Sequence, residues 1–189
     1  MRTGRLAVFA LIALGALALA GCSGSNSSNE TEAPVFLSVD VPSVNPEVSI
    51  SVPADVTIAT LTISSHAKSP SVTLSPQQDV ILDQWVITCT RTDGGTVASP
   101  QWQTFFTVYV PAGGSANVLN ARVFAEENFT QAPLYQLFPQ NGGIDKETGN
   151  NSIRQKLHVE VFGKTVAGQK ISVAFDLNYK FAYLFVSTG

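Results

Sequence analysis

The sequence predicts an all-β fold, a single β-sandwich of about seven to nine antiparallel strands. The strand-favouring residues Val, Ile and Thr number 21, 9 and 16 among 189 residues. Apolar and polar residues alternate along several short runs, and no long run has helical periodicity. Glycine and proline turn signals separate these runs roughly every 8 to 15 residues.

Composition excludes several classes of function. Charged residues make up 13% of the chain, whereas soluble domains carry about 25%. With 11 basic against 14 acidic residues, the chain lacks the basic surface that binds nucleic acid. Its two cysteines are too few for a disulfide scaffold or a multi-cysteine zinc site, and its 44% hydrophobic residues suffice to form a core.

The N-terminus has the pattern of a secretory signal peptide. Arg2 and Arg5 precede an apolar run over residues 6–20, which is shorter than the roughly 20 residues that a membrane-spanning helix needs. An ordinary secretory leader or a plain anchor helix would share these features, so the residues at the end of the run decide between them.

The run ends in Leu19, Ala20, Gly21 and Cys22. This tetrad resembles the lipobox of bacterial lipoproteins. The resemblance implies that residues 1–21 are a lipoprotein signal peptide, cleaved before Cys22, and that Cys22 is the lipidation site. Because each buried methylene contributes about 0.8 kcal/mol, several acyl chains anchor a protein durably in a membrane. Ser23, rather than Asp, follows the cysteine, which in the sorting pattern of such lipoproteins implies the outer membrane, on either its periplasmic or its surface side.

The mature chain divides into a tether and one domain. Residues 22–33 are polar, lack apolar periodicity and predict a flexible tether that reaches about 20 Å. Residues 34–189 are expected to form the sandwich. Loss of the leader leaves nine basic and 14 acidic residues, a net charge of −5, and Cys89 as the one cysteine without lipid. An intramolecular disulfide is therefore excluded.

Alternation of apolar residues places the strands. It is clearest over residues 47–52. Between Ile58 and Leu61 the apolar positions change parity, which predicts either a β-bulge near Ala59 or a strand buried on both faces. The other strands are expected at residues 36–41, 56–63, 72–74, 80–90, 102–110, 117–124, 154–162, 170–177 and 179–186.

Residues 80–110 are the clearest unit, a hairpin with an extended loop. Trp85, Ile87 and Cys89 share one strand face, and a turn signal at residues 93–95 precedes the second strand. This arrangement resembles the core tryptophan strand of immunoglobulin-like and fibronectin type III-like modules, and the resemblance implies an immunoglobulin-like sandwich. The paired cysteines of true immunoglobulin domains are missing, because Cys89 has no partner. A jelly roll or a small open barrel gives a similar pattern.

Few residues have the pattern of a catalytic or metal site. His158 and Glu160 share a strand face and offer a metal-binding or proton-transfer pair, but Lys156 in the same row favours a solvated face. His66 lies in a predicted turn, and the phase of Cys89 favours a core residue over a thiol nucleophile. Nucleophile-elbow, phosphate-loop and zinc-protease motifs are absent, so we expect no enzyme, cofactor or metal.

Residues 126–149 are irregular, with one short helix expected near residues 133–138. The stretch 141–151 offers oxygen ligands to Ca²⁺, although their order departs from that of an EF-hand loop. A turn-rich connection explains the same residues, because glycines allow positive φ and Asn and Asp cap their own backbone. The oxygen-bearing side chains are those of Asp145, Glu147, Asn150 and Asn151.

Aromatic residues supply the remaining candidate site. Phe105 and Tyr109 lie opposite the strand face of Trp102 and Phe106, and a second aromatic row occupies alternate positions of residues 179–185. Apolar residues on two faces indicate burial on both sides, which we favour, or an exposed row that binds a ligand. Phe105 and Tyr109 are the candidate ligand surface.

These observations predict a non-enzymatic lipoprotein of the outer membrane, held by its N-terminal lipid, that binds another envelope protein. The alternative is a surface-displayed carbohydrate-binding or adhesive module that uses Phe105 and Tyr109. A hydrolase or a metal-dependent enzyme built on His158 and Glu160 is the third hypothesis. Exposure of the aromatic residues discriminates between the first two, and a pocket that gathers His158, Glu160 and another polar group would support the third.

Overall fold

The computed structural model describes residues 33–42 and 44–184. The predicted signal peptide, Cys22 and nearly all of the predicted tether lie outside the described residues, as does Phe185 at the end of the second aromatic row. Ala33, the last residue of the predicted tether, is buried in the core.

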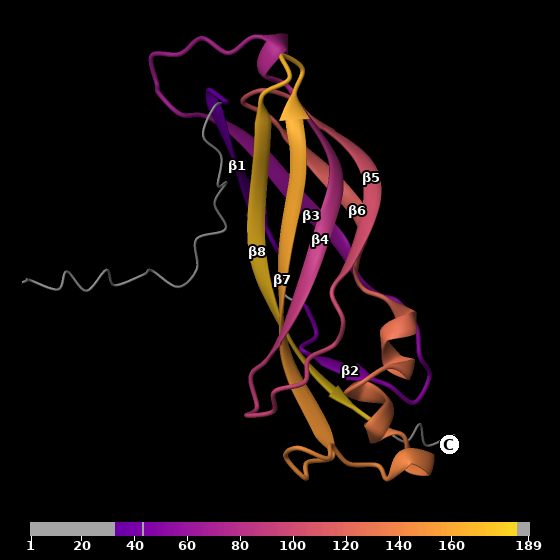
Figure 1. The fold of residues 1–189 in the computed structure, drawn as a ribbon. Coiled ribbons are helices and arrows are strands. Elements are labelled where there is room, and N and C mark those ends of the chain that lie inside the picture. Colours follow the sequence, from indigo (N-terminus) through magenta and orange to yellow (C-terminus); the bar gives the residue numbers. More distant parts are fainter. Residues whose placement is uncertain (1–32, 43, 185–189) are drawn as a thin grey trace, which may run out of the picture.

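The described chain is all-β, as the sequence predicts, and its eight strands form two sheets packed as a sandwich (Figure 1). The strands are β1 (Val35–Asp40), β2 (Glu47–Ser49), β3 (Val56–Ala67), β4 (Val80–Arg91), β5 (Trp102–Val110), β6 (Ser115–Phe124), β7 (Ser152–Thr165) and β8 (Lys170–Ala182). Four short 3-10 turns complete the described elements: η1 (Pro76–Gln78), η2 (Glu126–Thr130), η3 (Leu134–Leu137) and η4 (Pro139–Asn141).

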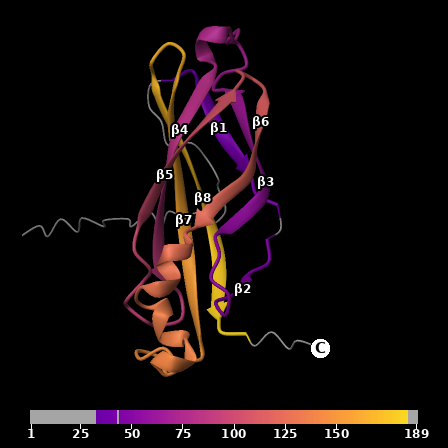
Figure 2. The same cartoon turned by 90° about the vertical axis from the view of Figure 1, so that its right-hand side faces the viewer.

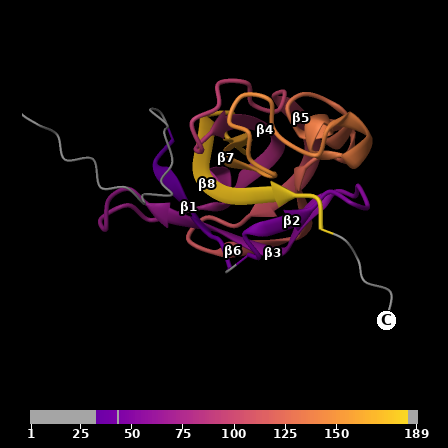
Figure 3. The same cartoon turned by 90° about the horizontal axis from the view of Figure 1, so that it is seen from below.

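The strands divide unequally between the sheets. One sheet has the order β1-β3-β6 and the other the order β2-β8-β7-β4-β5. Seen from below, the two sheets form two layers (Figure 3), and the side view places β2 and β5 at opposite sides of the sandwich (Figure 2). Neighbouring strands run antiparallel except β2 and β8, which are parallel. The expectation of antiparallel strands throughout is therefore wrong for this pair, because the chain leaves β1, crosses to the other sheet and enters β2 in the direction of β8.

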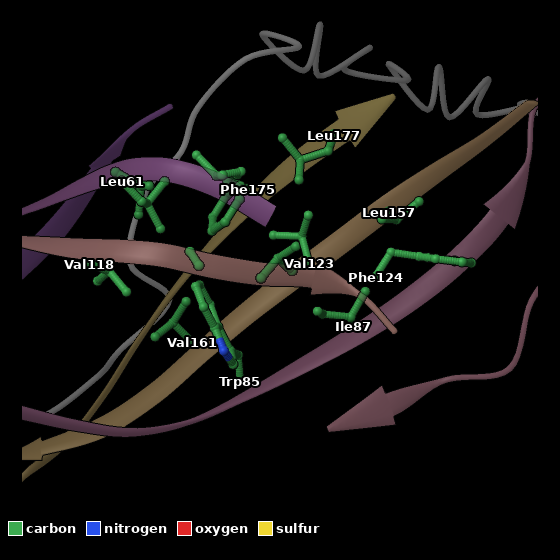
Figure 4. Packing of buried hydrophobic residues seen from close by; sticks show 14 of the residues in the cluster. Leu61, Trp85, Ile87, Val118, Val123, Phe124, Leu157, Val161, Phe175 and Leu177 are labelled. Atoms are coloured by element: carbon green, nitrogen blue, oxygen red, sulfur yellow. The ribbon is translucent and has the colours of Figure 1, made fainter. Parts of the chain in front are cut away.

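Apolar side chains from both sheets fill the space between them (Figure 4). The Trp85 ring of β4 packs with its centroid 4.9 Å from that of Phe106 and 6.5 Å from that of Phe175. Ile87 and Cys89 are buried on the same face of β4, which confirms the face that the sequence predicts. From the opposing sheet, the buried side chains in this view are those of Leu61, Val118, Val123 and Phe124.

The change of parity in β3 is real, but its cause differs from the one expected. Ile58 and Leu61 are both buried, while the two residues between them are exposed. The register against β6 shifts between Val56 and Thr57, earlier than the predicted bulge near Ala59. On β6, Asn120 has a φ of 50°, a left-handed conformation, and it lies between the partners of Ile58 and Thr60.

Three further expectations need correction. Residues 72–74 form no strand, and η1 follows them, capped by the Ser75 side chain. The expected strands 170–177 and 179–186 are one strand, β8, because burial alternates without interruption to Phe181. The helix expected near 133–138 is the 3-10 turn η3, one of three such turns between β6 and β7. None of the helical segments among the described residues is long and apolar enough to span a membrane.

Candidate binding surface

The outer side of β5 carries the most exposed aromatic residues of the described chain. Side chains at Trp102, Phe106 and Val108 turn toward the core and are half-buried. The alternate positions face solvent, where Phe105 is 71% exposed and Tyr109 is 53% exposed. The structure therefore places the predicted ligand surface in water, and the burial of both faces that the sequence favours does not hold for β5.

Strand register extends this surface across the sheet. Ile81 of β4 pairs with Tyr109, and Gln84 of β4 pairs with Phe105 on one side and with Phe162 of β7 on the other. Ile81 and Phe162 are half-buried and lie on the outer face. We call Ile81, Phe105, Tyr109 and Phe162 the aromatic face. Its residues come from three adjacent strands, with Gln84 between Phe105 and Phe162 and with Lys164 on the far side of Ile81 from Tyr109. Exposed apolar residues gathered in this way are typical of a binding surface.

Hydrogen bonds fix the orientation of this face. The Tyr109 hydroxyl donates to the buried Asp79 carboxylate, which also accepts from the Ala112 amide at 2.7 Å. The bonds from Tyr109 and Ala112 hold the pKa of Asp79 below its usual value, and the bond to Asp79 raises the pKa of Tyr109. The Gln84 amide donates to the Gln103 side-chain oxygen at 3.0 Å beside Phe105. Tyr109 is thus held in one orientation before any ligand arrives.

The backbone of β5 is also open on one side. β5 forms the edge of the five-stranded sheet and pairs only with β4 among the described residues. Charged side chains and prolines usually protect an edge strand from further pairing. The nine residues of β5 include neither. The aromatic face therefore adjoins an unprotected strand edge.

The predicted His158–Glu160 pair does not form a site. Both residues lie on the outer face, but His158 Nδ1 bonds Asp176 Oδ1 of β8 at 2.7 Å, and Lys156 Nζ lies 3.3 Å from Asp176 Oδ2. Burial raises the pKa of Asp176, but the hydrogen bonds from His158 and Lys156 outweigh it and leave that pKa lowered. In the part of the chain that is described, no three or more His, Cys, Asp or Glu residues gather as a metal site.

The other residues that the sequence singles out pack against, or bond to, neighbouring protein groups. His66 Nε2 bonds Ser38 Oγ at 2.8 Å, and its ring stacks on Phe36. Cys89 is buried, and burial raises the pKa of its thiol to about 12, which confirms the core interpretation. In the second aromatic row, Tyr179 and Phe181 are buried, but the other face of β8 is not covered, because Asp176 and Asn178 are exposed.

The acidic side chains of the 141–151 loop bind protein groups. Asp145 is fully buried and accepts from Arg91 Nη2 at 2.7 Å and from Thr148 Oγ1 at 2.6 Å. Glu147 accepts from the Thr96 amide at 2.9 Å, and Arg91 Nε donates to Asp93 at 2.7 Å. These bonds fasten the loop to the β4–β5 connection, so these two carboxylates serve the loop's own structure.

Sequence reasoning missed Arg91, although a signal was present. Arg91 continues the inward parity of Trp85, Ile87 and Cys89 along β4, so its side chain has to point into the protein. An inward arginine requires buried acceptors. The acidic loop 141–151 was the segment able to supply them.

Comparisons with known proteins add no identification. No protein-family model matches the chain, and no curated protein matches it.

Proposed function

We propose that this protein is a lipid-anchored, non-enzymatic binding module of the bacterial envelope that recognises another envelope protein through the aromatic face. The observation that carries the proposal is the exposure of Phe105 and Tyr109 on a rigid sheet. Burying a side chain of this size contributes about 1.5–3 kcal/mol. Aromatic anchors of this kind dominate the affinity of protein interfaces. A sheet surface also loses little conformational entropy on binding, because its side chains are already ordered.

The composition of the aromatic face favours a protein partner. Ile81 and Phe162 extend the apolar surface beyond the two exposed rings, in the way that an interface core is apolar while its rim is polar. A surface-displayed carbohydrate-binding role is the second candidate. It is supported by Gln84 and Gln103, whose amides lie beside Phe105 and are able to bond sugar hydroxyls while a sugar ring stacks on the phenyl ring.

The strand order supports an immunoglobulin-like assignment. If β2 is taken as an extension of the first strand, β1, β3 and β6 correspond to strands A, B and E, and β4, β7 and β8 to strands C, F and G. Trp85 then lies on strand C, where immunoglobulin domains carry their buried tryptophan. Cys89 remains without a disulfide partner.

The anchor is proposed from the sequence. Cys22 receives the lipid, and the flexible tether that the sequence places at residues 22–33, whose last residue Ala33 packs in the core, lets the domain reach about 20 Å from the outer membrane. The non-enzymatic role agrees with the raised pKa of the Cys89 thiol, because a thiol nucleophile needs a lowered one. It also agrees with His158 being bonded to Asp176 on a solvated sheet face.

Site-specific photo-crosslinking in intact cells tests the proposal. A photoreactive phenylalanine analogue replaces Phe105 in one variant and Leu119 in the control, because Leu119 is 68% exposed but lies on the three-stranded sheet. We expect a discrete protein adduct from position 105 and none from position 119. Adducts of equal yield from both positions, or no protein adduct from position 105, would contradict the proposal. A polysaccharide adduct from position 105 would establish the carbohydrate-binding alternative.

A further inference from the structure

A groove of about 740 Å³ lies at the side of the sandwich opposite β5. It is lined by the end of β1, by Pro42, Val44 and Asn45 of the β1–β2 connection, and by β2. The first half of β3 and the segment that joins it to β2 complete the lining, together with Tyr179 of β8. Figure 2 shows β2 and β3 on this side, away from β5. The groove is thus separate from the surface on which the proposed function rests.

The wall of the groove is an uncovered strand edge. β1 pairs with β3 only from Ala67 back to Thr62, because β1 ends at Asp40 and the chain then crosses to the other sheet. Over residues 56–61, β3 has β6 on one side and no strand on the other among the described residues. A free edge of this kind binds an extended chain through backbone hydrogen bonds. At about 3.3 Å per residue, these positions accept a segment of roughly 20 Å.

The lining of the groove combines apolar, hydroxyl-bearing and acidic side chains. Val48, Val52 and Ile58 line it, and Val52 is 70% exposed. Its charged residues are all acidic: Asp40, Glu47 and Asp55. Glu47 is paired with Lys180 at 2.9 Å and Asp55 with Arg122 at 2.8 Å, whereas Asp40 has no ion pair within the described residues. The groove therefore complements a chain with apolar and basic side chains.

A buried phenol opens into the same groove. Tyr179 is 3% exposed and lines the groove, and its hydroxyl is not among the buried side-chain atoms that lack a hydrogen-bond partner. Burial also raises the pKa of Tyr179, so the hydroxyl remains a donor at neutral pH. A carbonyl group of a bound chain can accept a hydrogen bond from it.

We propose that this groove binds an extended segment of a partner protein, with alternating apolar and basic side chains, which adds as a strand to the uncovered edge of β3. The segment's backbone pairs with residues 56–61, and its apolar side chains contact Val48 and Val52. Its basic side chains lie near Asp40. This site is additional to the aromatic face, and each can bind without the other.

Peptide titration of the purified protein tests the site. The probe is an acetylated heptapeptide that alternates lysine with valine, and backbone amide signals of the protein are followed by NMR. We expect a Kd on the order of 100 µM, with the largest chemical-shift changes at the amides of residues 56–61. A peptide of the same sequence with N-methylated alternate amides should not bind, because it cannot donate the strand hydrogen bonds. A peptide that alternates glutamate with valine should bind at least tenfold more weakly.

Matched variants distinguish peptide binding in the groove from non-specific binding elsewhere on the protein. Val52→Lys should weaken binding at least tenfold, whereas Val166→Lys, an exposed valine outside the groove, should leave it unchanged. Tyr179→Phe removes only the hydroxyl and should weaken binding about fivefold. Phe105→Ala should bind the peptide like the wild type, which separates this site from the proposed function.

Four results would overturn the proposal. They are no binding of the lysine–valine peptide at about 1 mM, equal binding of the N-methylated peptide, equal binding by Val52→Lys, and shifts centred on β5 instead of β3. Self-association of the protein that Val52→Lys abolishes would identify a second copy as the occupant. Tighter peptide binding in Phe185→Ser would instead identify the chain's own C-terminal residues.

Discussion

The ion cluster around Arg91 allows a prediction whose size follows from burial. The guanidinium is 1% exposed, Asp145 is fully buried, and their atoms lie 2.7 Å apart. In Arg91→Met, the side chain keeps most of its length but loses its charge and its donors. Asp145 then remains in the interior without its cation, and Asp93 loses its bond from Arg91 Nε.

The expected loss of stability is large. Removing one partner of a buried ion pair costs about 3–5 kcal/mol, because the other charge stays buried without compensation. Arg122→Met is the matched control, since Arg122 pairs with Asp55 and Glu127 at the surface, where ion pairs contribute about 1 kcal/mol or less. Adding Asp145→Leu to Arg91→Met should restore part of the lost stability, because the uncompensated carboxylate is then gone.

The pH dependence of this loss has a definite sign. In the wild type, burial raises the pKa of Asp145, but bonds from Arg91 and Thr148 outweigh it and the pKa is lowered. The stability from Asp145 is therefore present above its unfolded pKa of about 3.9 and is lost as pH falls through the folded pKa. Without Arg91, burial dominates and raises that pKa, so the variant gains stability on acidification. The difference between wild type and variant should shrink from pH 7 to about pH 4.

Urea unfolding of wild type, Arg91→Met, Arg122→Met and the double variant at both pH values measures these differences. A loss below about 1 kcal/mol at pH 7 in Arg91→Met would refute the reasoning, because it would place the cluster in effectively solvated surroundings. A loss that stays constant between the two pH values would refute the assigned protonation states.

Three further predictions follow from single residues. Gly163→Ala should lower the free energy of unfolding by about 2 kcal/mol or more, because a Cβ there would clash with the Ile81 carbonyl and lie 2.8 Å from Leu82 Cα; a urea midpoint equal to the wild type would contradict this. Cys89 should react with a thiol reagent only on unfolding, since its pKa is raised to about 12, and rapid labelling of the native protein would disprove its burial. Cys22→Ala should abolish incorporation of labelled palmitate, and unchanged labelling would exclude Cys22 as the lipidation site.

Local patterns in the sequence predict much of the fold. The inward face of β4 follows from Trp85, Ile87 and Cys89 in alternation, and residues 102–110 are expected and found as β5. The sequence predicts two strands where the structure has the single strand β8. The expected break lies at Asn178, a residue that favours turns. The apolar alternation of Leu177, Tyr179 and Phe181 nevertheless continues through it. Propensity at one polar residue does not outweigh pairing along a whole strand.

Non-local contacts set the limit of sequence-based prediction. The parallel pairing of β2 with β8 joins Glu47 to Lys180, and the Arg91–Asp145 bond joins residues 54 positions apart. Periodicity indicates that Arg91 points inward, but it identifies neither its partner Asp145 nor the strand that pairs with β2. The sequence singles out Phe105 and Tyr109 but favours their burial, because their exposure depends on β5 being an edge strand, which the order of strands decides. The groove beside β3 likewise arises only because β1 stops pairing at Thr62.

The central claim is that the aromatic face is the recognition surface, and the affinity of the crosslinked partner tests it most directly. The purified partner is titrated with the wild type, Phe105→Ala and Leu119→Ala by calorimetry. We predict that Phe105→Ala weakens binding about 30-fold, the effect of losing about 2 kcal/mol at an interface anchor, while Leu119→Ala changes nothing. Equal affinities for the wild type and Phe105→Ala would contradict the account.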